Sequence, residues 1–271
     1  MELAVSSSGH FVDYLISRNY DHLFDVLIES SKACMDFSEG NKLKSCELVL
    51  EPPEVINQSN KEKFIEVCSS YSIKKQLHGP FLDMSLCSSN PWIAKSSIES
   101  YVESAKICHE IEAEIMVVHP GRSGLRTQAK KRLVTNVIEL LDAVSDYGVK
   151  ICLENMPKHE SILLDENEFE YFSSKVNRND LFFTFDTSHF WTNSGDVNQF
   201  WNKFHKKIKN VHIAENADKN SDRHPDLGTG KVDFPNILEV LKKFEYEGSL
   251  VIELNSAKNL QKSVEYLRDL L

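Results

Sequence analysis

Short apolar runs alternate with amphipathic stretches along the whole chain. The apolar runs, which are typical of β-strands, cover residues 2–6, 46–51, 74–81, 114–120, 149–154, 181–186, 210–214 and 249–254. The stretches with helical periodicity cover residues 21–36, 60–71, 93–111, 127–147, 165–176, 196–207, 234–246 and 257–271. In 127–147, for example, Leu133, Val137 and Leu140 recur at the spacing of one helix face. The pattern therefore predicts a strand followed by a helix, repeated along the chain.

This alternation predicts an α/β fold, the (β/α)₈ TIM barrel. The strand runs are almost continuously apolar, as expected for a parallel sheet that is covered on both faces. Such a barrel uses about 250 residues as one domain. The chain has 271 residues and no linker rich in Gly, Ser or Pro, so we expect a single domain over 1–271. A doubly wound open sheet is the alternative, but no G-x-G-x-x-G motif follows the first strand.

Composition narrows the class of protein further. The net charge is −10, from 31 basic and 41 acidic residues, which argues against broad binding to DNA through a basic surface. The six cysteines contain no C-x-x-C pair, so we expect free thiols. The first residues lack the basic and apolar segments of a secretion signal, and no apolar run approaches the ~20 residues of a membrane span. We therefore expect a cytoplasmic protein with no membrane partner.

Histidine and carboxylate side chains recur where the predicted strands end or in the loops that follow. They are His78, His119, Glu154, Asp186, His189, His212, Asp222, His224 and Glu253. In a closed barrel these side chains would converge on one mouth. Imidazoles and carboxylates together are the ligands of zinc or manganese, and a carboxylate after an apolar run is costly unless it is paired or coordinated. The sequence therefore predicts a metal site, with a purely structural polar network as the alternative.

Three motifs carry a resemblance that extends over nearly the whole chain. HPG at 119–121, DTSH at 186–189 and DRHPDLGTG at 222–230 make the sequence similar to the xylose isomerase-like TIM-barrel superfamily. This superfamily includes endonuclease IV, the zinc-dependent abasic-site endonuclease, and sugar isomerases and epimerases.

The two branches imply different metal contents. Similarity to endonuclease IV implies three metals, held in turn by His78, His119 and Glu154; by Glu154, Asp186, His212 and Glu253; and by His189, Asp222 and His224. Similarity to the epimerases implies one metal on the second of these sets, with Glu154 and Glu253 also transferring protons.

The chain departs from endonuclease IV where that family reads DNA. Phe81 stands where endonuclease IV has a tyrosine, and DTSH replaces its DTCH. The loop after the second strand reads EPPEVINQS at 51–59, which is acidic and has no arginine, whereas endonuclease IV has a basic and aromatic loop there. The resemblance thus keeps the metal ligands but not the DNA-binding elements.

Two functions follow as hypotheses. The first is a sugar or sugar-phosphate isomerase or epimerase, in which Glu154 and Glu253 move a proton and Arg223, His189 and Phe81 contact the substrate. Arg122, Trp92 and Trp191 are further candidates for substrate contacts, the two tryptophans in loops after strands. The second is a zinc phosphodiesterase acting on abasic-site DNA, and a dehydratase or aldolase-type lyase is a third possibility. The cofactor would be one to three divalent ions per chain: zinc for a histidine-rich cage, or manganese, cobalt or magnesium for a site richer in carboxylates.

Overall fold

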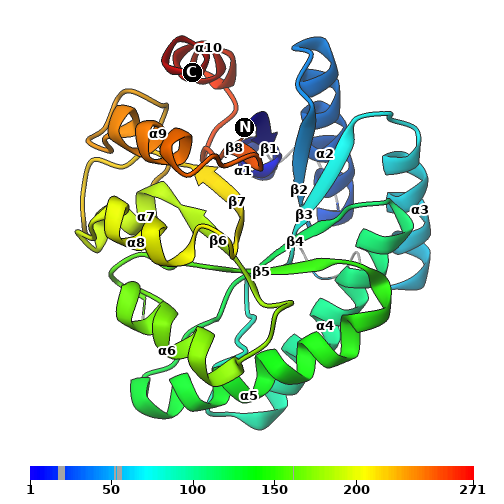
Figure 1. The fold of residues 1–271 in the computed structure, drawn as a ribbon. Coiled ribbons are helices and arrows are strands. Elements are labelled where there is room, and N and C mark those ends of the chain that lie inside the picture. Colours follow the sequence, from blue (N-terminus) through cyan, green and yellow to red (C-terminus); the bar gives the residue numbers. More distant parts are fainter. Residues whose placement is uncertain (18–21, 52, 54–56, 161) are drawn as a thin grey trace.

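The computed structural model describes residues 1–17, 22–51, 53, 57–160 and 162–271. Its strands form a closed parallel barrel in chain order, β1 to β8, and this confirms the (β/α)₈ prediction and excludes the open sheet (Figure 1). The strands are β1 (Glu2–Ser6), β2 (Ser45–Val49), β3 (Lys74–His78), β4 (Ile115–Val118), β5 (Lys150–Glu154), β6 (Phe182–Asp186), β7 (Ile208–Ile213) and β8 (Ser249–Ile252).

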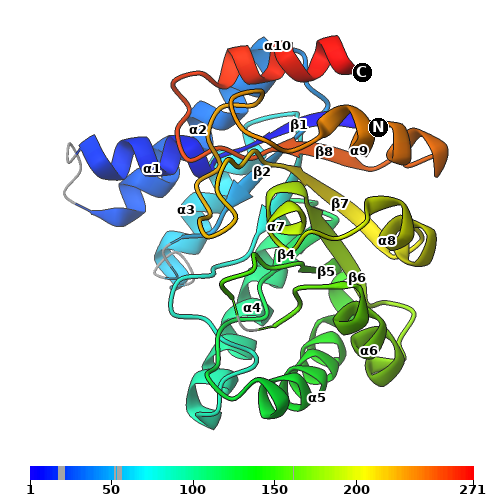
Figure 2. The same ribbon diagram turned by 90° about the vertical axis from the view of Figure 1, so that its left-hand side faces the viewer.

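Helices surround the barrel in both ribbon views (Figure 2). They are α1 (Ser8–Ser17), α2 (Leu23–Gly40), α3 (Gln58–Ser69), α4 (Pro91–Glu110), α5 (Arg126–Val144), α6 (Glu166–Val176), α7 (Thr187–Thr192), α8 (Val197–Phe204), α9 (Phe234–Lys243) and α10 (Leu260–Leu270), with a 3₁₀ turn at Ser145–Tyr147. Two helices, α1 and α7, were not expected from the sequence. The short helix α7 begins directly after β6 because the Asp186 carboxylate accepts a hydrogen bond from the His189 backbone N–H (2.7 Å) and so caps it.

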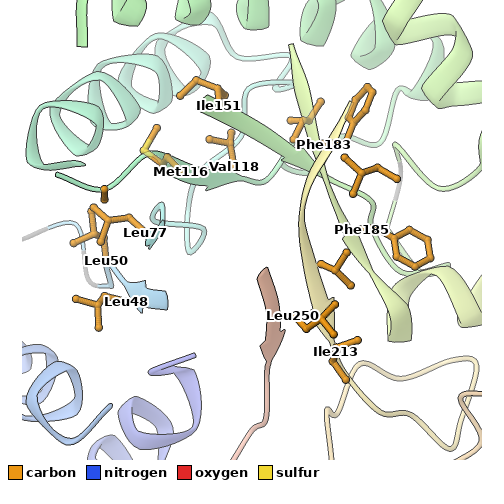
Figure 3. Packing of buried hydrophobic residues seen from close by; sticks show 14 of the residues in the cluster. Leu48, Leu50, Leu77, Met116, Val118, Ile151, Phe183, Phe185, Ile213 and Leu250 are labelled. Carbon is orange, nitrogen blue, oxygen red and sulfur yellow. The ribbon is translucent and has the colours of Figure 1, made fainter. Parts of the chain in front are cut away.

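Alternate strand residues face outward and inward. The outward residues are apolar and form the main core with the helices, and Figure 3 shows several of them, among them Leu48, Leu77 and Phe185. The inward layer below the mouth is polar, contrary to the expectation that both faces of the strands would be apolar. Gln76 Nε2 donates to Glu47 Oε2 (2.8 Å) and to Asn210 Oδ1 (2.9 Å). These polar groups tolerate burial because they bond to one another across the narrow barrel.

The strand register brings the predicted site residues to one level. His78 pairs with Val49 of β2 and Val117 of β4, and Asp186 pairs with His212 of β7. All eight strands are parallel, so their carboxyl ends open on the same mouth. The residues that end β3, β5 and β6 therefore lie around a common space.

Two expectations from composition can be compared with the fold. All six cysteines are buried and free, as predicted. Among the described residues, no helix has both the length and the apolar character needed to cross a membrane.

Candidate metal centre

The predicted ligand residues lie together at the barrel mouth. Three overlapping groups have candidate ligand atoms within 4.8 Å of one another: His78, His119 and Glu154; Glu154, Asp186, His212 and Glu253; and Asp186, His189 and His224. The ninth residue, Asp222, adjoins the last group, since its Oδ1 lies 3.2 Å from His189 Nε2 and 2.8 Å from His224 Nε2. The structure thus brings together side chains that are far apart in the sequence.

Glu154 lies at the centre of this cluster. Its carboxylate, at the end of β5, is 1 % exposed. Oε2 lies 2.9 Å from His119 Nε2 and 3.5 Å from His78 Nε2, and Oε1 lies 3.1 Å from His212 Nδ1. The same His212 nitrogen lies 3.0 Å from Glu253 Oε2. The Glu154 carboxylate therefore links the group that contains His78 and His119 to the group that contains His212.

Backbone carbonyls orient two of the imidazoles. His78 Nδ1 lies 2.8 Å from the carbonyl oxygen of Gly79, and His189 Nδ1 lies 2.8 Å from that of Asn155. A carbonyl only accepts, so Nδ1 carries the proton and the Nε2 lone pair faces the cluster. His212 is turned the other way, with Nδ1 toward Glu154 and Nε2 toward Glu47 (3.1 Å). Each ring thus points one nitrogen into the cluster while a hydrogen-bond partner holds the other, as in metal-binding histidines.

Several atoms of the cluster lack hydrogen bonds. Asp186 Oδ2, His189 Nε2 and His224 Nε2 are buried and have no hydrogen-bond partner among the described residues. The nearby Asp222 carboxylate lies close to both imidazoles and would share a cation with them. Burying such groups without partners is costly, and a divalent cation would satisfy all three atoms at once. The residues present therefore fit a metal ion.

The electrostatics of the cluster favour ionised carboxylates. Burial raises the pKa of Glu253, but the neighbouring His212 outweighs it and lowers that pKa to about 2. Burial likewise opposes ionisation of Glu154, yet His212 and His119 hold its pKa well below the usual range. Burial dominates at Asp186 and raises its pKa to about 6. Burial opposes protonation of His78 and His224, yet the neighbouring carboxylates raise the pKa of each to about 9, so a cation that binds here would displace protons from the imidazoles.

The loop between β7 and α9 carries Asp222 and His224. It is organised by Glu215, a buried residue that the sequence analysis did not single out. Its carboxylate accepts backbone hydrogen bonds from Asn216 (2.9 Å), Gly228 (3.1 Å) and Val232 (3.0 Å). His224 has a left-handed backbone (φ 38°), and its carbonyl accepts from the Asn255 N–H (3.0 Å). Strain of this kind persists where surrounding contacts enforce it, and here it holds the imidazole in the mouth.

Asn155 follows Glu154 in the sequence and is buried. Its side chain bonds both backbone groups of Asp186, donating to the carbonyl (3.0 Å) and accepting from the N–H (2.7 Å). Asn155 therefore fixes the end of β6 rather than the carboxylate beside it in sequence.

A cavity of about 560 Å³ adjoins the cluster and is lined by Phe81, His119, Arg122, Glu160 and Asp222, among others. The half-exposed Phe81 ring has its centroid 5.4 Å from that of His78 and 5.3 Å from that of His119. The Phe81 backbone is held by Glu51, a buried carboxylate that accepts from the N–H groups of Phe81 and Leu82. Phe81 thus forms one wall above the candidate ligands.

The other candidates for substrate contacts are placed less favourably. Arg122 Nε donates to Glu160 Oε2 (2.7 Å), so its charge is paired, and Arg223 is exposed. The sequence had placed the two tryptophans in loops, but both lie in helices. Trp92 is in the first turn of α4 and 76 % exposed, and Trp191 is in α7. The helices after β3 and β6 begin earlier than the apolar pattern indicated, because Asn90 and Asp186 cap their N-termini.

Known proteins resemble the chain in both sequence and structure. A probable endonuclease 4 of Mycoplasma mycoides subsp. mycoides is 26 % identical over 76 % of this chain and 77 % of its own. A D-tagatose 3-epimerase-like protein is 25 % identical, with a TM-score of 0.80 over 100 % of this chain and 97 % of its own. The IOLI protein with a binding zinc atom has the same fold, with a TM-score of 0.77, 18 % identity, and coverage of 100 % and 96 %.

The family comparison covers most of the barrel. The model of the xylose isomerase-like TIM barrel family matches residues 42–270, which run from just before β2 to the end of α10. These residues include every one of the candidate metal ligands. The chain belongs to the xylose isomerase-like TIM barrel family.

Proposed function

We propose that this protein is a divalent-metal-dependent isomerase or epimerase that acts on a sugar. The observation that carries the proposal is the pair of carboxylates Glu154 and Glu253. They come from β5 and β8, which are separated by two strands in the barrel, yet both lie close to His212 Nδ1, at 3.1 and 3.0 Å. Two carboxyl groups that reach one space from different strands suit removal of a proton from a carbon by one group in its ionised form and return of a proton by the other in its protonated form.

The proposed chemistry uses the residues as follows. A divalent metal bound by Glu154, Asp186, His212 and Glu253 would polarise a substrate carbonyl. One of the two glutamates takes the proton from the carbon beside that carbonyl, which leaves an enediolate. The other glutamate, which takes up a proton from water beforehand, supplies that proton to the opposite face, or to the neighbouring carbon in an isomerisation, and the first glutamate then releases its proton to water. The lowered pKa values of Glu154 and Glu253 leave the glutamate that acts as the base unprotonated at neutral pH.

The surroundings of the site support a small polyhydroxylated substrate. The adjoining cavity of about 560 Å³ is of the size used for small ligands. Its wall carries the carboxylates Asp83, Glu160 and Asp222. Their oxygens accept hydrogen bonds from the hydroxyl groups of a sugar, whereas their negative charge disfavours a polyanion. Phe81 supplies the apolar surface against which a sugar ring packs. The structural relatives include a D-tagatose 3-epimerase-like protein and a zinc-bound protein, in line with this proposal.

A phosphodiesterase acting on abasic-site DNA is the second candidate. It is favoured by the number of candidate ligands. A single-metal epimerase needs only one ligand group, and this site has two more, one with His78 and His119 and one with His189 and His224. Two or three adjacent metals can stabilise both the attacking and the leaving oxygen of a phosphodiester. The probable endonuclease 4 relative points the same way.

The two candidates are separated by a pair of assays on the metal-loaded protein. The first incubates it with free ketoses, such as D-tagatose, D-allulose and D-fructose, in D₂O and follows deuterium incorporation beside the carbonyl by NMR. The second follows incision of a duplex containing one abasic site. Deuterium exchange that is lost in Glu253→Gln supports the isomerase or epimerase. Incision without exchange would replace it with the phosphodiesterase.

A further inference from the structure

A buried carboxylate lies inside the barrel, below the candidate ligands and outside their set. Glu47 is an inward residue of β2 and is 0 % exposed. Its Oε2 accepts from Gln76 Nε2 (2.8 Å) and from Asn210 Nδ2 (3.0 Å). His212 Nε2 lies 3.1 Å from Oε2 and 3.1 Å from Oε1. The carboxylate is thus held by three side chains, one from β3 and two from β7.

Only one of those three partners is ionisable. Gln76 and Asn210 are neutral amides, and they also bond to each other (2.9 Å). Burying a carboxylate with amide donors alone is costly, because neutral hydrogen bonds only partly replace the lost hydration. The Oε1 atom is buried and has no hydrogen bond within the described part of the chain, and its close neighbour is the His212 ring. The placement of Glu47 therefore needs an explanation that involves His212.

We infer that Glu47 is a positioning residue that fixes the tautomer and orientation of His212. This inference rests on the proposed metal centre. A carboxylate has no proton to donate, and in the metal-free structure both His212 nitrogens face carboxylates, Nε2 toward Glu47 and Nδ1 toward Glu154 and Glu253. A cation bound at Nδ1 would take the place of the proton there, so Nε2 would keep the one ring proton and donate it to Glu47. A flip of the ring would then be opposed, because it would turn Nε2–H away from Glu47 and Nδ1 away from Glu154 and Glu253.

His212 depends on a side chain for this more than the other oriented imidazoles do. His78 and His189 donate from Nδ1 to backbone carbonyls, so their orientation is set by the main chain. His212 is an internal strand residue whose backbone groups are used in the β7 ladder with β6 and β8. Its Nε2 instead faces a side chain from across the barrel, that of Glu47. Carboxylate partners of this kind strengthen metal binding by about 10–100-fold in other sites.

The test compares Glu47→Gln with Glu168→Gln in the full-length protein. Glu168 is also a buried carboxylate, but it pairs with Arg126 and Lys130 between α5 and α6 and lies outside the candidate ligand groups. Zinc is titrated into each metal-free protein in competition with a chromophoric chelator. We expect Glu47→Gln to bind zinc about 10–100-fold more weakly for one equivalent. We expect Glu168→Gln to match the wild type in affinity, although it is less stable. Circular dichroism establishes that each variant is folded.

A second measurement reads the tautomer directly, and its first result comes from the wild type alone. In the zinc-loaded protein with ¹⁵N-labelled histidine, we expect one imidazole with coordinated Nδ1 and a slowly exchanging Nε2–H. That Nε2–H signal should be lost in Glu47→Gln and kept in Glu168→Gln. Coordination of every histidine through Nε2 in the wild type would overturn the inference even if Glu47→Gln failed to fold.

The outcomes separate this inference from the proposed function. Unchanged zinc affinity and an unchanged Nε2–H signal in Glu47→Gln would refute the role of Glu47 while leaving the metal centre in place. A wild-type protein that binds no metal would refute both. In a third outcome, Glu47→Gln binds zinc more weakly, and the wild type cuts abasic-site DNA without exchanging deuterium into a ketose. The positioning role of Glu47 would then stand, and only the proposed reaction would change.

Discussion

Glu154 is the residue on which both candidate reactions depend. It contacts His119, His78 and His212 and belongs to two of the three candidate groups. The sequence could identify it, because a carboxylate that ends an apolar strand is hard to explain without a cation or an ion pair. It could not identify Glu47, because a glutamate in the middle of a strand run carries no comparable signal.

Replacing Glu154 should remove activity under either candidate reaction. In Glu154→Ala the imidazoles of His78, His119 and His212 lose their common carboxylate, and a proposed proton-transfer group is lost. We expect kcat/KM to fall by at least about 10²–10⁴-fold, the usual contribution of a positioned acid or base. Deuterium exchange on the ketose substrate measures this, with circular dichroism as the control for folding. Full activity in the variant would show that the assignment is wrong.

Glu168 provides a test of electrostatics outside the candidate metal centre. Burial opposes its ionisation, but Lys130, the Leu164 N–H and Arg126 lower its pKa in the folded protein. A carboxyl group with a lowered folded pKa stabilises the fold above its unfolded pKa of about 4.3, and this stabilisation is lost as the pH falls through the folded value. Glu168→Gln should therefore lower the free energy of unfolding by about 1–3 kcal/mol at pH 7. Because Arg126 is half-exposed, the lower part of this range is expected.

Urea unfolding of the metal-free proteins at pH 7 and at pH 3.5 measures the effect. The difference between wild type and Glu168→Gln should shrink at the lower pH. A difference that is constant with pH would mean that the charge of Glu168 is not what stabilises the contact.

At the level of elements, the loop between β7 and α9 differs most from the expectation of a simple connection. Glu215 gathers three backbone N–H groups of the loop, and Gly230 packs so closely that a Cβ there would lie 2.3 Å from Glu215 Oε1. The sequence of this loop contains Gly228 and Gly230, which are typical of a tight turn. It gave no sign of the carboxylate around which the loop closes, since Glu215 resembles any polar residue after a strand.

Asp222 in this loop distinguishes the two candidate functions. It contacts His189 and His224 but lies outside the Glu154, Asp186, His212 and Glu253 group. For the proposed isomerase or epimerase, Asp222→Ala should lower kcat/KM less than about 10-fold, because no proton-transfer group is lost. In the abasic-site incision assay, a loss approaching that of Glu154→Ala would favour the three-metal phosphodiesterase.

At the scale of the whole molecule, the barrel was predictable and its interior was not. Eight apolar runs separated by helical stretches identify the fold because each repeat has a clear period. The helices α1 and α7 were not predicted; α7 has six residues and begins within the DTSH motif, so it is too short to show a helical period. Convergence of the candidate ligands followed from the fold, because parallel strands share one mouth. The supporting contacts of Glu47, Asn155 and Glu215 join distant parts of the chain and depend on three-dimensional packing that one sequence does not encode visibly.

Metal content per chain is the measurement that tests the central claim most directly. Elemental analysis of protein purified without chelator and without a histidine tag would supply it. The account predicts at least one zinc, manganese or cobalt ion per chain, and near one for the proposed isomerase or epimerase. Close to three zinc ions would move the assignment to the phosphodiesterase. A protein that retains no metal, and binds none on titration, would contradict the claim that these side chains converge to hold a cation.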